Sequence, residues 1–153
     1  MARTDPVLVD SNVILDVAYE DPQWRAWSEA AIEQAADQIV LVINPIIYAE
    51  VSIGYTHVEH VEAVLPLDRF RREALPYEAA FLAGKSFVTY RRRGGRRTSP
   101  LPDFYIGAHA AVRGYRLLSR DVTRYRTYFP MVELIAPSAP AQKRAGRQGC
   151  RSI

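Results

Sequence analysis

Short apolar runs alternate with longer stretches of helical periodicity along this chain. The runs lie at residues 7–10, 39–43, 116–119 and 131–135, and Val, Ile and Leu dominate them. Such runs are typical of strands that are buried on both faces of a sheet, because a half-exposed strand would alternate apolar and polar residues. Strands separated by helices are joined as parallel neighbours. The pattern therefore predicts an α/β fold, with a central parallel sheet of four to five strands and helices on both faces.

Proline and glycine indicate where the helices begin and end. Proline favours the first turn of a helix, and it opens helical stretches at positions 22, 45, 76 and 102, while glycine closes such stretches near positions 54, 94 and 114. The helix that begins at Pro76 is predicted from a stripe at positions 0, +4, +7 and +11, formed by Tyr77, Phe81, Gly84 and Val88. Residues 67–75 are charged and mixed, and they remain unassigned.

Length and composition predict one globular domain over residues 1–136 of the 153. Residues 137–153 are rich in Pro, Ala, Gly and basic side chains, which predicts a disordered basic tail. The net charge of +3 comes from this tail, because the rest of the chain has 16 basic and 17 acidic side chains. A lone cysteine, Cys150, and the absence of a signal peptide or a long apolar run predict an unexported cytoplasmic protein with no membrane association.

Four acids occupy positions where an isolated surface charge is not expected. Asp10 and Asp121 follow predicted strands, and the carboxyl ends of parallel strands meet at one edge of the sheet, where ligands bind. Glu50 shares a helix face with Ile46, Ile47 and Ile53, and Asp103 shares one with small and apolar residues. An unpaired carboxylate on an apolar face is costly, so each of these acids should find a partner or line a cation site.

Each acid has a simpler structural interpretation when it is taken alone. Asp103 suits a helix start and Asp121 suits a cap, while Asp16 is expected to be solvated or to support the others. Asn12 and Ser119 either form turns or orient the carboxylates. The three histidines are expected on the surface or in ordinary packing. Carboxylates crowded together call for a hard divalent cation, and with no His or Cys among them the pattern favours Mg²⁺ or Mn²⁺ over zinc.

Four segments in order resemble the PIN-domain ribonucleases, and within them the VapC-type toxins of bacterial toxin–antitoxin pairs. They read VLVDSNVILD at 7–16, NPIIYAEV at 44–51, PDFYIGAHA at 102–110 and LLSRD at 117–121. Tyr125 and the Tyr-Phe-Pro at 128–130 follow the same pattern. The resemblance covers residues 7–136, and the tail has no counterpart in it.

The resemblance implies a PIN-like fold in which Asp10, Glu50, Asp103 and Asp121 are the catalytic, metal-binding acids. It places Ser119 near the metal and Asn12 in a supporting position. It also implies a Mg²⁺- or Mn²⁺-dependent endoribonuclease, the toxin of a toxin–antitoxin pair, in which bound metal activates water for phosphodiester hydrolysis. Asp10 and Asp103 are expected to bind the metal directly, and Glu50 and Asp121 either directly or through water.

Substrate and partner contacts are predicted from charge and from exposed apolar surface. An acidic centre needs surrounding cations to hold RNA, and six stand in a stretch that has no acid: Lys85, Arg91, Arg92, Arg93, Arg96 and Arg97. A solvated helix end is their simpler interpretation. A homodimer and a small antitoxin are the expected protein partners. We expect the antitoxin to lie in a groove formed by Trp24, Trp27, Ile47, Tyr48 and Val51.

Two other classes of function remain open at this point. A receiver-like signalling domain also binds Mg²⁺ at strand ends. Proteins of that class place a lysine beside the acids, but neither Lys85 nor Lys143 of this chain follows a strand. A PIN-like scaffold without catalysis is the second alternative, and the intact set of acids argues against it. A dehalogenase-type phosphatase would need an acid two residues after Asp10, where Asn12 stands.

Overall fold

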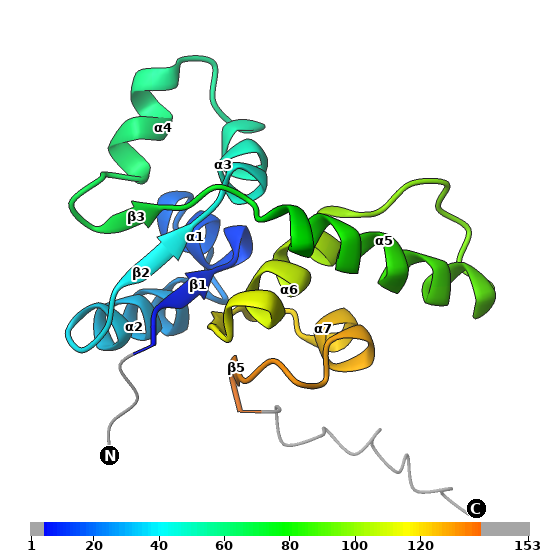
Figure 1. Ribbon diagram of the computed structural model, residues 1–153. Coiled ribbons are helices and arrows are strands. Elements are labelled where there is room, and N and C mark those ends of the chain that lie inside the picture. The colour runs from blue at the N-terminus through cyan, green and yellow to red at the C-terminus, as the bar shows by residue number, and fades with distance from the viewer. Residues whose placement is uncertain (1–4, 139–153) are drawn as a thin grey trace, which may run out of the picture.

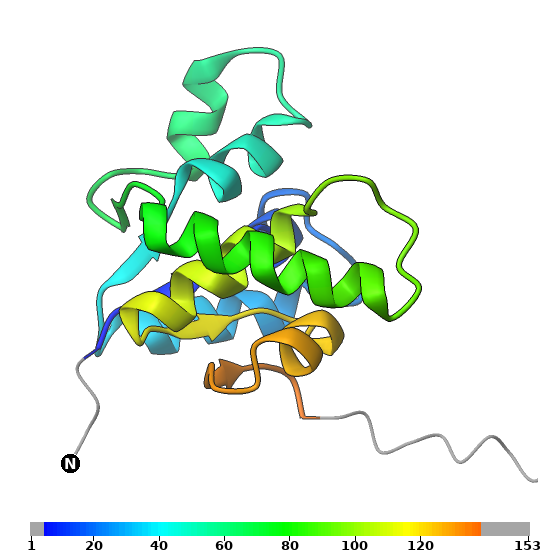
Figure 2. The same cartoon turned by 45° about the vertical axis from the view of Figure 1, so that its right-hand side comes forward.

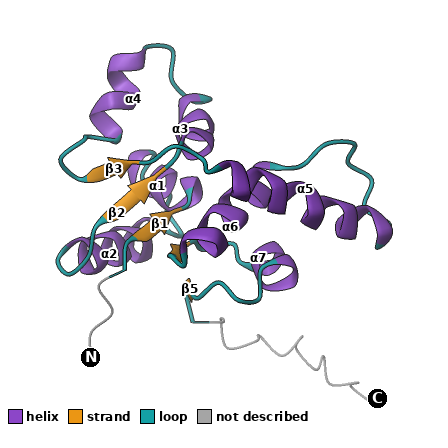
Figure 3. Cartoon of the chain, viewed as in Figure 1, coloured by secondary structure: helices purple, strands orange, loops and turns teal. Residues whose placement is uncertain are grey.

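A five-stranded parallel sheet organises the protein, and the computed structural model describes it over residues 5–138. The strand order is β3-β2-β1-β4-β5, so β1 lies in the middle. Figures 1 and 3 show β3, β2 and β1 side by side in this order. The strands are short: β1 Val7–Val9, β2 Leu41–Ile43, β3 Phe70–Arg72, β4 Arg116–Leu118 and β5 Leu134–Ile135. Every residue of β1 and β2 is buried, as their unbroken apolar sequences predict.

Seven helices connect the strands within the described residues. They are α1 Ser11–Ala18, α2 Arg25–Ala36, α3 Pro45–Ser52, α4 Val58–Val64, α5 Tyr77–Arg92, α6 Pro102–Arg113 and α7 Thr123–Tyr128. The chain moves from β1 to β3 in one direction and returns from β3 to β4, so right-handed crossovers place α5 and α6 on the face opposite α1 and α2. Figure 2 shows α5 and α6 in front of the strands, with α1 and α2 behind them. The prediction of a parallel sheet covered on both faces is confirmed.

The register of the central strands aligns the residues that follow them. Val9 of β1 pairs with Leu118 of β4, and the Asp10 amide donates to the Leu118 carbonyl at 2.9 Å. Asp10 and Ser119 are therefore neighbours at the carboxyl edge of the sheet. Asn44 follows β2 and Glu73 follows β3 at the same edge. One edge thus collects a polar residue from each of four adjacent strands.

Residues 67–75, which the sequence left unassigned, contain the edge strand β3. Its Phe70-Arg71-Arg72 sequence has only one buried side chain, Phe70, and so lacks the apolar run of the other strands. The remaining elements lie where they were predicted, with shifts of a few residues at their ends. The start of α2 shifts because Asp21 caps a separate turn through the Gln23 and Trp24 amides, and the helix itself begins at Arg25. The predicted tail lies outside the described residues from 139 onward.

The stripe of residues that predicted α5 does not face the core. Tyr77 is 92% exposed, Phe81 69% and Val88 41%. The helix instead turns its smaller residues inward, with Ala79 and Ala83 fully buried and Phe87 and Tyr90 packed on the core. Large apolar residues defined the stripe in the sequence, whereas the close approach of α5 to α6 selects alanine.

Two glycines shape α6, the helix that carries Asp103: one ends it and the other allows close packing against it. Gly114 closes α6 with φ of 68°, a left-handed conformation that side chains other than glycine rarely adopt. Gly107 lies in the middle of α6, where a Cβ atom would overlap the buried ring of Phe129. The absence of a side chain therefore lets the segment after α7 lie directly on α6. Within residues 5–138, none of the helices combines the length and apolarity that crossing a membrane requires.

Candidate active site at the carboxyl edge of the sheet

Asp10 is the most deeply placed of the four predicted acids. It is 4% exposed and caps α1, with Oδ1 accepting a 2.8 Å hydrogen bond from the Ser11 amide. Its Oδ2 accepts from Ser119 Oγ at 2.9 Å and from the Tyr125 hydroxyl at 2.7 Å. Burial raises the pKa of Asp10 to about 6, even though these hydrogen bonds lower it. The carboxylate is thus held firmly by neutral donors.

Glu50 reaches the same place from α3. Ser11 Oγ donates to its Oε1 at 3.0 Å, so one serine contacts both acids. Burial, together with the charges of Asp10 and Asp103, raises the pKa of Glu50 to about 7, even though the hydrogen bond from Ser11 lowers it. The expectation that Glu50 lies inside an apolar face is correct for Ile47, which is buried, but wrong for Ile53, which is 85% exposed.

Asp103 stands in the first turn of α6 and faces a cation. Arg124 Nη1 lies 3.7 Å from its Oδ2, and the guanidinium also lies over the rings of Tyr90 and Phe104. Burial still raises the pKa of Asp103, opposed by Arg124 and reinforced by the charge of Asp121. Asp103 and Asp121 line one cavity of about 380 Å³, whose walls include Tyr90, Tyr128 and Arg124.

The structure brings three of the four predicted acids close to one another and leaves the fourth at the surface. Asp10, Glu50 and Asp103 lie within electrostatic reach of one another, whereas Asp121 is exposed and acts on Asp103. Ser119 ties Asp121 to the others, because its Oγ bonds to Asp10 and to the backbone of Asp121. Asn12 donates to Ser119 Oγ at 3.1 Å. Both predicted supporting residues therefore lie behind Asp10.

Asp16 has a structural role: of the two predicted alternatives, a solvated or a supporting acid, the structure shows the second. It is 3% exposed and forms a two-pronged ion pair with Arg120, at 2.7 and 3.0 Å. Ser28 of α2 donates to its Oδ2 at 2.7 Å. The pair joins α1 to the segment after β4, and Trp24 stacks on the Arg120 guanidinium. Asp16 supports the site by fixing these elements.

The cations predicted to bind RNA differ in their surroundings. Arg91 donates to the Gly95 and Arg97 carbonyls and so shapes its own loop. Arg93 lies over the Tyr128 ring, at the wall of the Asp103 cavity. Lys85 lies over Phe81 on the exposed side of α5. Arg124, which was not predicted from the sequence, is a cation in contact with a predicted catalytic acid, Asp103.

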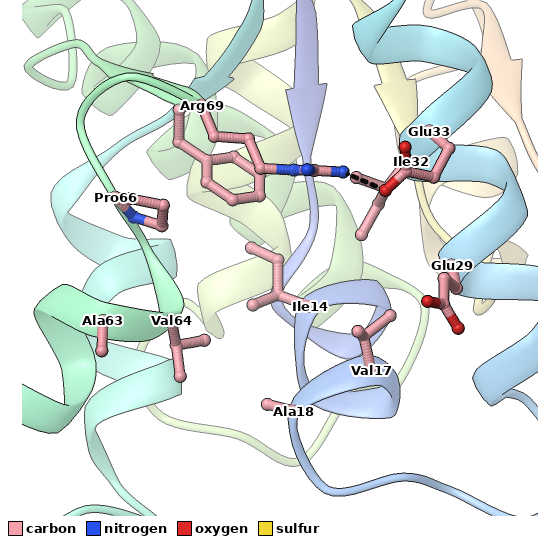
Figure 4. A pocket seen from close by; sticks show the side chains of 11 residues that line it. Ile14, Val17, Ala18, Glu29, Ile32, Glu33, Ala63, Val64, Pro66 and Arg69 are labelled. Atoms are coloured by element: carbon pink, nitrogen blue, oxygen red, sulfur yellow. Dashed lines mark hydrogen bonds and ion pairs between the residues drawn. The ribbon is translucent and has the colours of Figure 1, made fainter.

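The groove predicted from the two tryptophans does not exist in that form. Ile47 and Val51 are fully buried and line no surface, and Tyr48 bonds to Glu62. An apolar hollow of about 280 Å³ lies instead between α1, α2 and α4 (Figure 4). Its lining includes Ile14, Val17, Ile32, Val64 and Phe70, and the ion pair from Arg69 to Glu33 crosses it at 2.7 Å.

The carboxylate oxygens at the acidic edge are ligands of the kind that a hard divalent cation prefers. Asp10, Glu50 and Asp103 are carboxylates whose pKa values are all raised, and a bound cation would favour their ionised forms. Across the part of the chain that the structure describes, no three Asp, Glu, His or Cys side chains are grouped closely enough to hold a metal ion as they stand. Binding would therefore require the carboxylates to draw closer together.

Tyr125 and Arg124 are the site residues that sequence reasoning missed. Both lie on the six-residue helix α7, where the sequence TRYRTY has the appearance of an exposed, charged turn. Tyr125 is nonetheless 1% exposed, and burial raises the pKa of its hydroxyl well above the usual value. The sequence showed that Tyr125 follows the PIN-like pattern, but its contact with Asp10 depends on how α7 packs on α6.

The fold and this edge define a class: parallel α/β domains that gather carboxylates where the central strands end. A match to the PIN domain family covers residues 7–130, and the chain belongs to that family. Membership overturns the receiver-like alternative. No curated protein sequence matches the chain.

Solved structures share this fold at low sequence identity. VapBC2 from Rickettsia felis, bound to a promoter DNA fragment, matches with a TM-score of 0.68 and 17% identity, over 87% of this chain and 99% of that one. VapBC-1 from nontypeable Haemophilus influenzae matches with a TM-score of 0.65 and 19% identity, over 86% and 97%. VapC20 from Mycobacterium tuberculosis, described as a sarcin–ricin loop cleaving toxin, matches with a TM-score of 0.58 and 15% identity, over 83% and 98%.

Proposed function

We propose that this protein is a Mg²⁺- or Mn²⁺-dependent endoribonuclease and the toxin of a toxin–antitoxin pair. The observation that carries the proposal is the position of Asp10, which is buried at the end of the central strand and has no cationic partner among residues 5–138. Glu50 and Asp103 approach it from two helices, and the pKa values of all three acids are raised. Membership of the PIN family and the likeness to VapC proteins support the choice of RNA and of a toxin role.

The side chains of this site would divide the work of phosphodiester hydrolysis. Ser119 and Tyr125 hold Oδ2 of Asp10, and Ser11 holds Oδ1 while it also contacts Glu50. A divalent cation held by Asp10, Glu50, Asp103 and Asp121 would lower the pKa of the attacking water and offset charge on the scissile phosphate. Arg124 would exchange its contact with Asp103 for an RNA phosphate. Tyr128 and Arg93 would border the path of the RNA strand.

The decisive test replaces Asp10 by Asn, which removes charge without changing volume. Cleavage of single-stranded RNA with Mg²⁺ or Mn²⁺ should fall by about 10²–10³-fold or more, the scale of losing one electrostatic contributor to the transition state. Asp68→Asn is the matched control, because it removes the same charge from an exposed turn before β3, at the opposite end of the strands. Undiminished cleavage in Asp10→Asn would remove Asp10 from the mechanism. If the wild-type protein does not cleave RNA, the PIN-like scaffold without catalysis is the alternative that remains.

The partners follow from the same proposal. The hollow between α1, α2 and α4 offers an apolar floor with Arg69 on one wall and Glu29 and Glu33 on another, which suits an amphipathic segment of a small antitoxin. The exposed Tyr77 and Phe81 on α5 support a homodimer, which light scattering would detect. A neighbouring reading frame that encodes a small DNA-binding protein would identify the antitoxin.

A further inference from the structure

A second polar cluster, away from the acids, connects the two helices that carry Glu50 and Asp103. His109 of α6 is fully buried, and its Nδ1 lies 3.0 Å from Asn44 Nδ2. Asn44 is 2% exposed and caps α3, with Oδ1 accepting from the Ile47 amide at 2.9 Å. On the other side of the ring, His109 Nε2 lies 3.0 Å from Glu73 Oε1.

The partners of His109 determine which ring nitrogen carries the proton. Because Asn44 Oδ1 already serves the Ile47 amide, the amide nitrogen of Asn44 is the group that faces the ring, and it can only donate. His109 Nδ1 is therefore an acceptor, and the proton resides on Nε2, which donates to Glu73. Tyr115 donates to the other oxygen of Glu73 at 2.8 Å, and Arg113 lies 3.3 Å from the first.

The link joins fixed points on α3 and α6. Asn44 precedes the first turn of α3, and Glu50 lies six residues further along. His109 lies six residues after Asp103 on α6, or about 9 Å at the helical rise of about 1.5 Å per residue. A hydrogen bond between Asn44 and His109 therefore fixes how one acid-bearing helix is placed against the other.

We propose that His109 is a positioning residue, which holds the capped end of α3 on α6 and so sets the placement of Glu50 relative to Asp103. This inference rests on the proposed nuclease function. The hydrogen bond to Asn44 carries the role, whereas the hydrogen bond to Glu73 stabilises the fold. A fully buried histidine is costly to desolvate, and an apolar residue would fill this space without requiring two polar partners.

Two substitutions separate the two hydrogen bonds. His109→Asn keeps an acceptor close to the position of Nδ1 and loses the contact with Glu73, while His109→Gln keeps a donor near Nε2 and loses the contact with Asn44. We expect His109→Gln to lower kcat by about 10-fold or more with little change in KM, the range seen when support behind a metal site is lost. His109→Asn should retain more of kcat, although it is the smaller residue and should have the lower melting temperature.

Opposite orders of kcat and of melting temperature in these two variants would support the inference, because a purely structural histidine would lower both together. The same order in both quantities would overturn it. Tyr115→Phe is the matched control, since it removes the Tyr115 contact with Glu73 and should leave kcat unchanged. Two readouts do not depend on RNA cleavage: Mn²⁺ affinity by calorimetry and hydrogen exchange of the Ile47 amide. Weaker Mn²⁺ binding and faster exchange in His109→Gln than in His109→Asn are expected even if the substrate is not RNA, and equal values would overturn the inference.

Discussion

Asp10 and Glu73 occupy equivalent places in the sheet and have opposite surroundings. Each directly follows a parallel strand at the same edge, Asp10 after β1 and Glu73 after β3. Hydroxyls and one backbone amide surround Asp10, and burial raises its pKa to about 6. Burial also acts to raise the pKa of Glu73, but hydrogen bonds from His109 and Tyr115 and the charge of Arg113 bring it below the usual value.

The difference shows that a place at the carboxyl edge does not by itself make an acid functional. Glu73 has its neutralising partners within the fold, with Arg71 at 3.5 Å in addition to Arg113. Asp10 and Glu50 have none among the described cations. The charge of Asp103 raises the pKa of both acids instead, and the charge of Asp10 also raises the pKa of Glu50. The acidic edge is therefore electrostatically incomplete, whereas the Glu73 cluster is complete. Three measurements test this contrast.

The largest effect is expected from adding a divalent cation. At pH 8, above the pKa values of about 6 for Asp10 and about 7 for Glu50, Mn²⁺ at 100 times its Kd should stabilise the wild type by about 2.7 kcal/mol. Asp10→Asn should show little of this gain, while Glu73→Gln should keep it. Thermal unfolding with Mn²⁺ and with EDTA provides the measurement. Equal melting temperatures for the wild type in both buffers would contradict the contrast.

Glu73→Gln tests the complete cluster. It should destabilise the fold at pH 7 by about 1.5 kcal/mol, the lower value for a hydrogen bond to a charged group. Because the folded pKa of Glu73 is lowered, its contribution is present above the unfolded pKa, near 4.5, and is lost as the pH falls through the folded value. Denaturant unfolding of both proteins at pH 7 and at pH 3 should show a smaller difference at pH 3 than at pH 7. A Glu73→Gln variant as stable as the wild type at pH 7 would show that the cluster gains nothing from the charge.

Glu50→Gln tests the incomplete edge and should have the smallest effect. The pKa of Glu50 is raised from 4.5 to about 7, so the folded protein holds a proton that the unfolded chain has lost. Stability in EDTA should therefore decline as the pH rises from about 4.5 to about 7. Glu50→Gln should reduce this decline and raise the melting temperature at pH 8 by about 2 °C. A shift of this size corresponds to a change in the free energy of unfolding of about 1 kcal/mol or less. A lower melting temperature at pH 8 would instead place Glu50 in a structural ion pair.

The sequence alone determined the central strands and the acids that follow them. Val7–Val9 and Leu41–Ile43 are apolar at every position, because both faces of the sheet are covered, and this signal is local. Asp10 directly follows one of these strands, so its position follows from the strand itself. Glu50 and Asp103 were identified because a carboxylate on an apolar helix face is costly, and the structure brings both close to Asp10.

The tertiary structure decided every feature that depends on packing between distant segments. Strand β3 has a single buried side chain, and only pairing with β2 makes it a strand. The exposed face of α5 could not be read from its large residues, because the alanines are selected by contact with α6. Tyr125 meets Asp10 across 115 positions of sequence, and His109 meets Asn44 across 65. A local pattern reports burial and periodicity, but it does not identify which polar group a buried side chain will face.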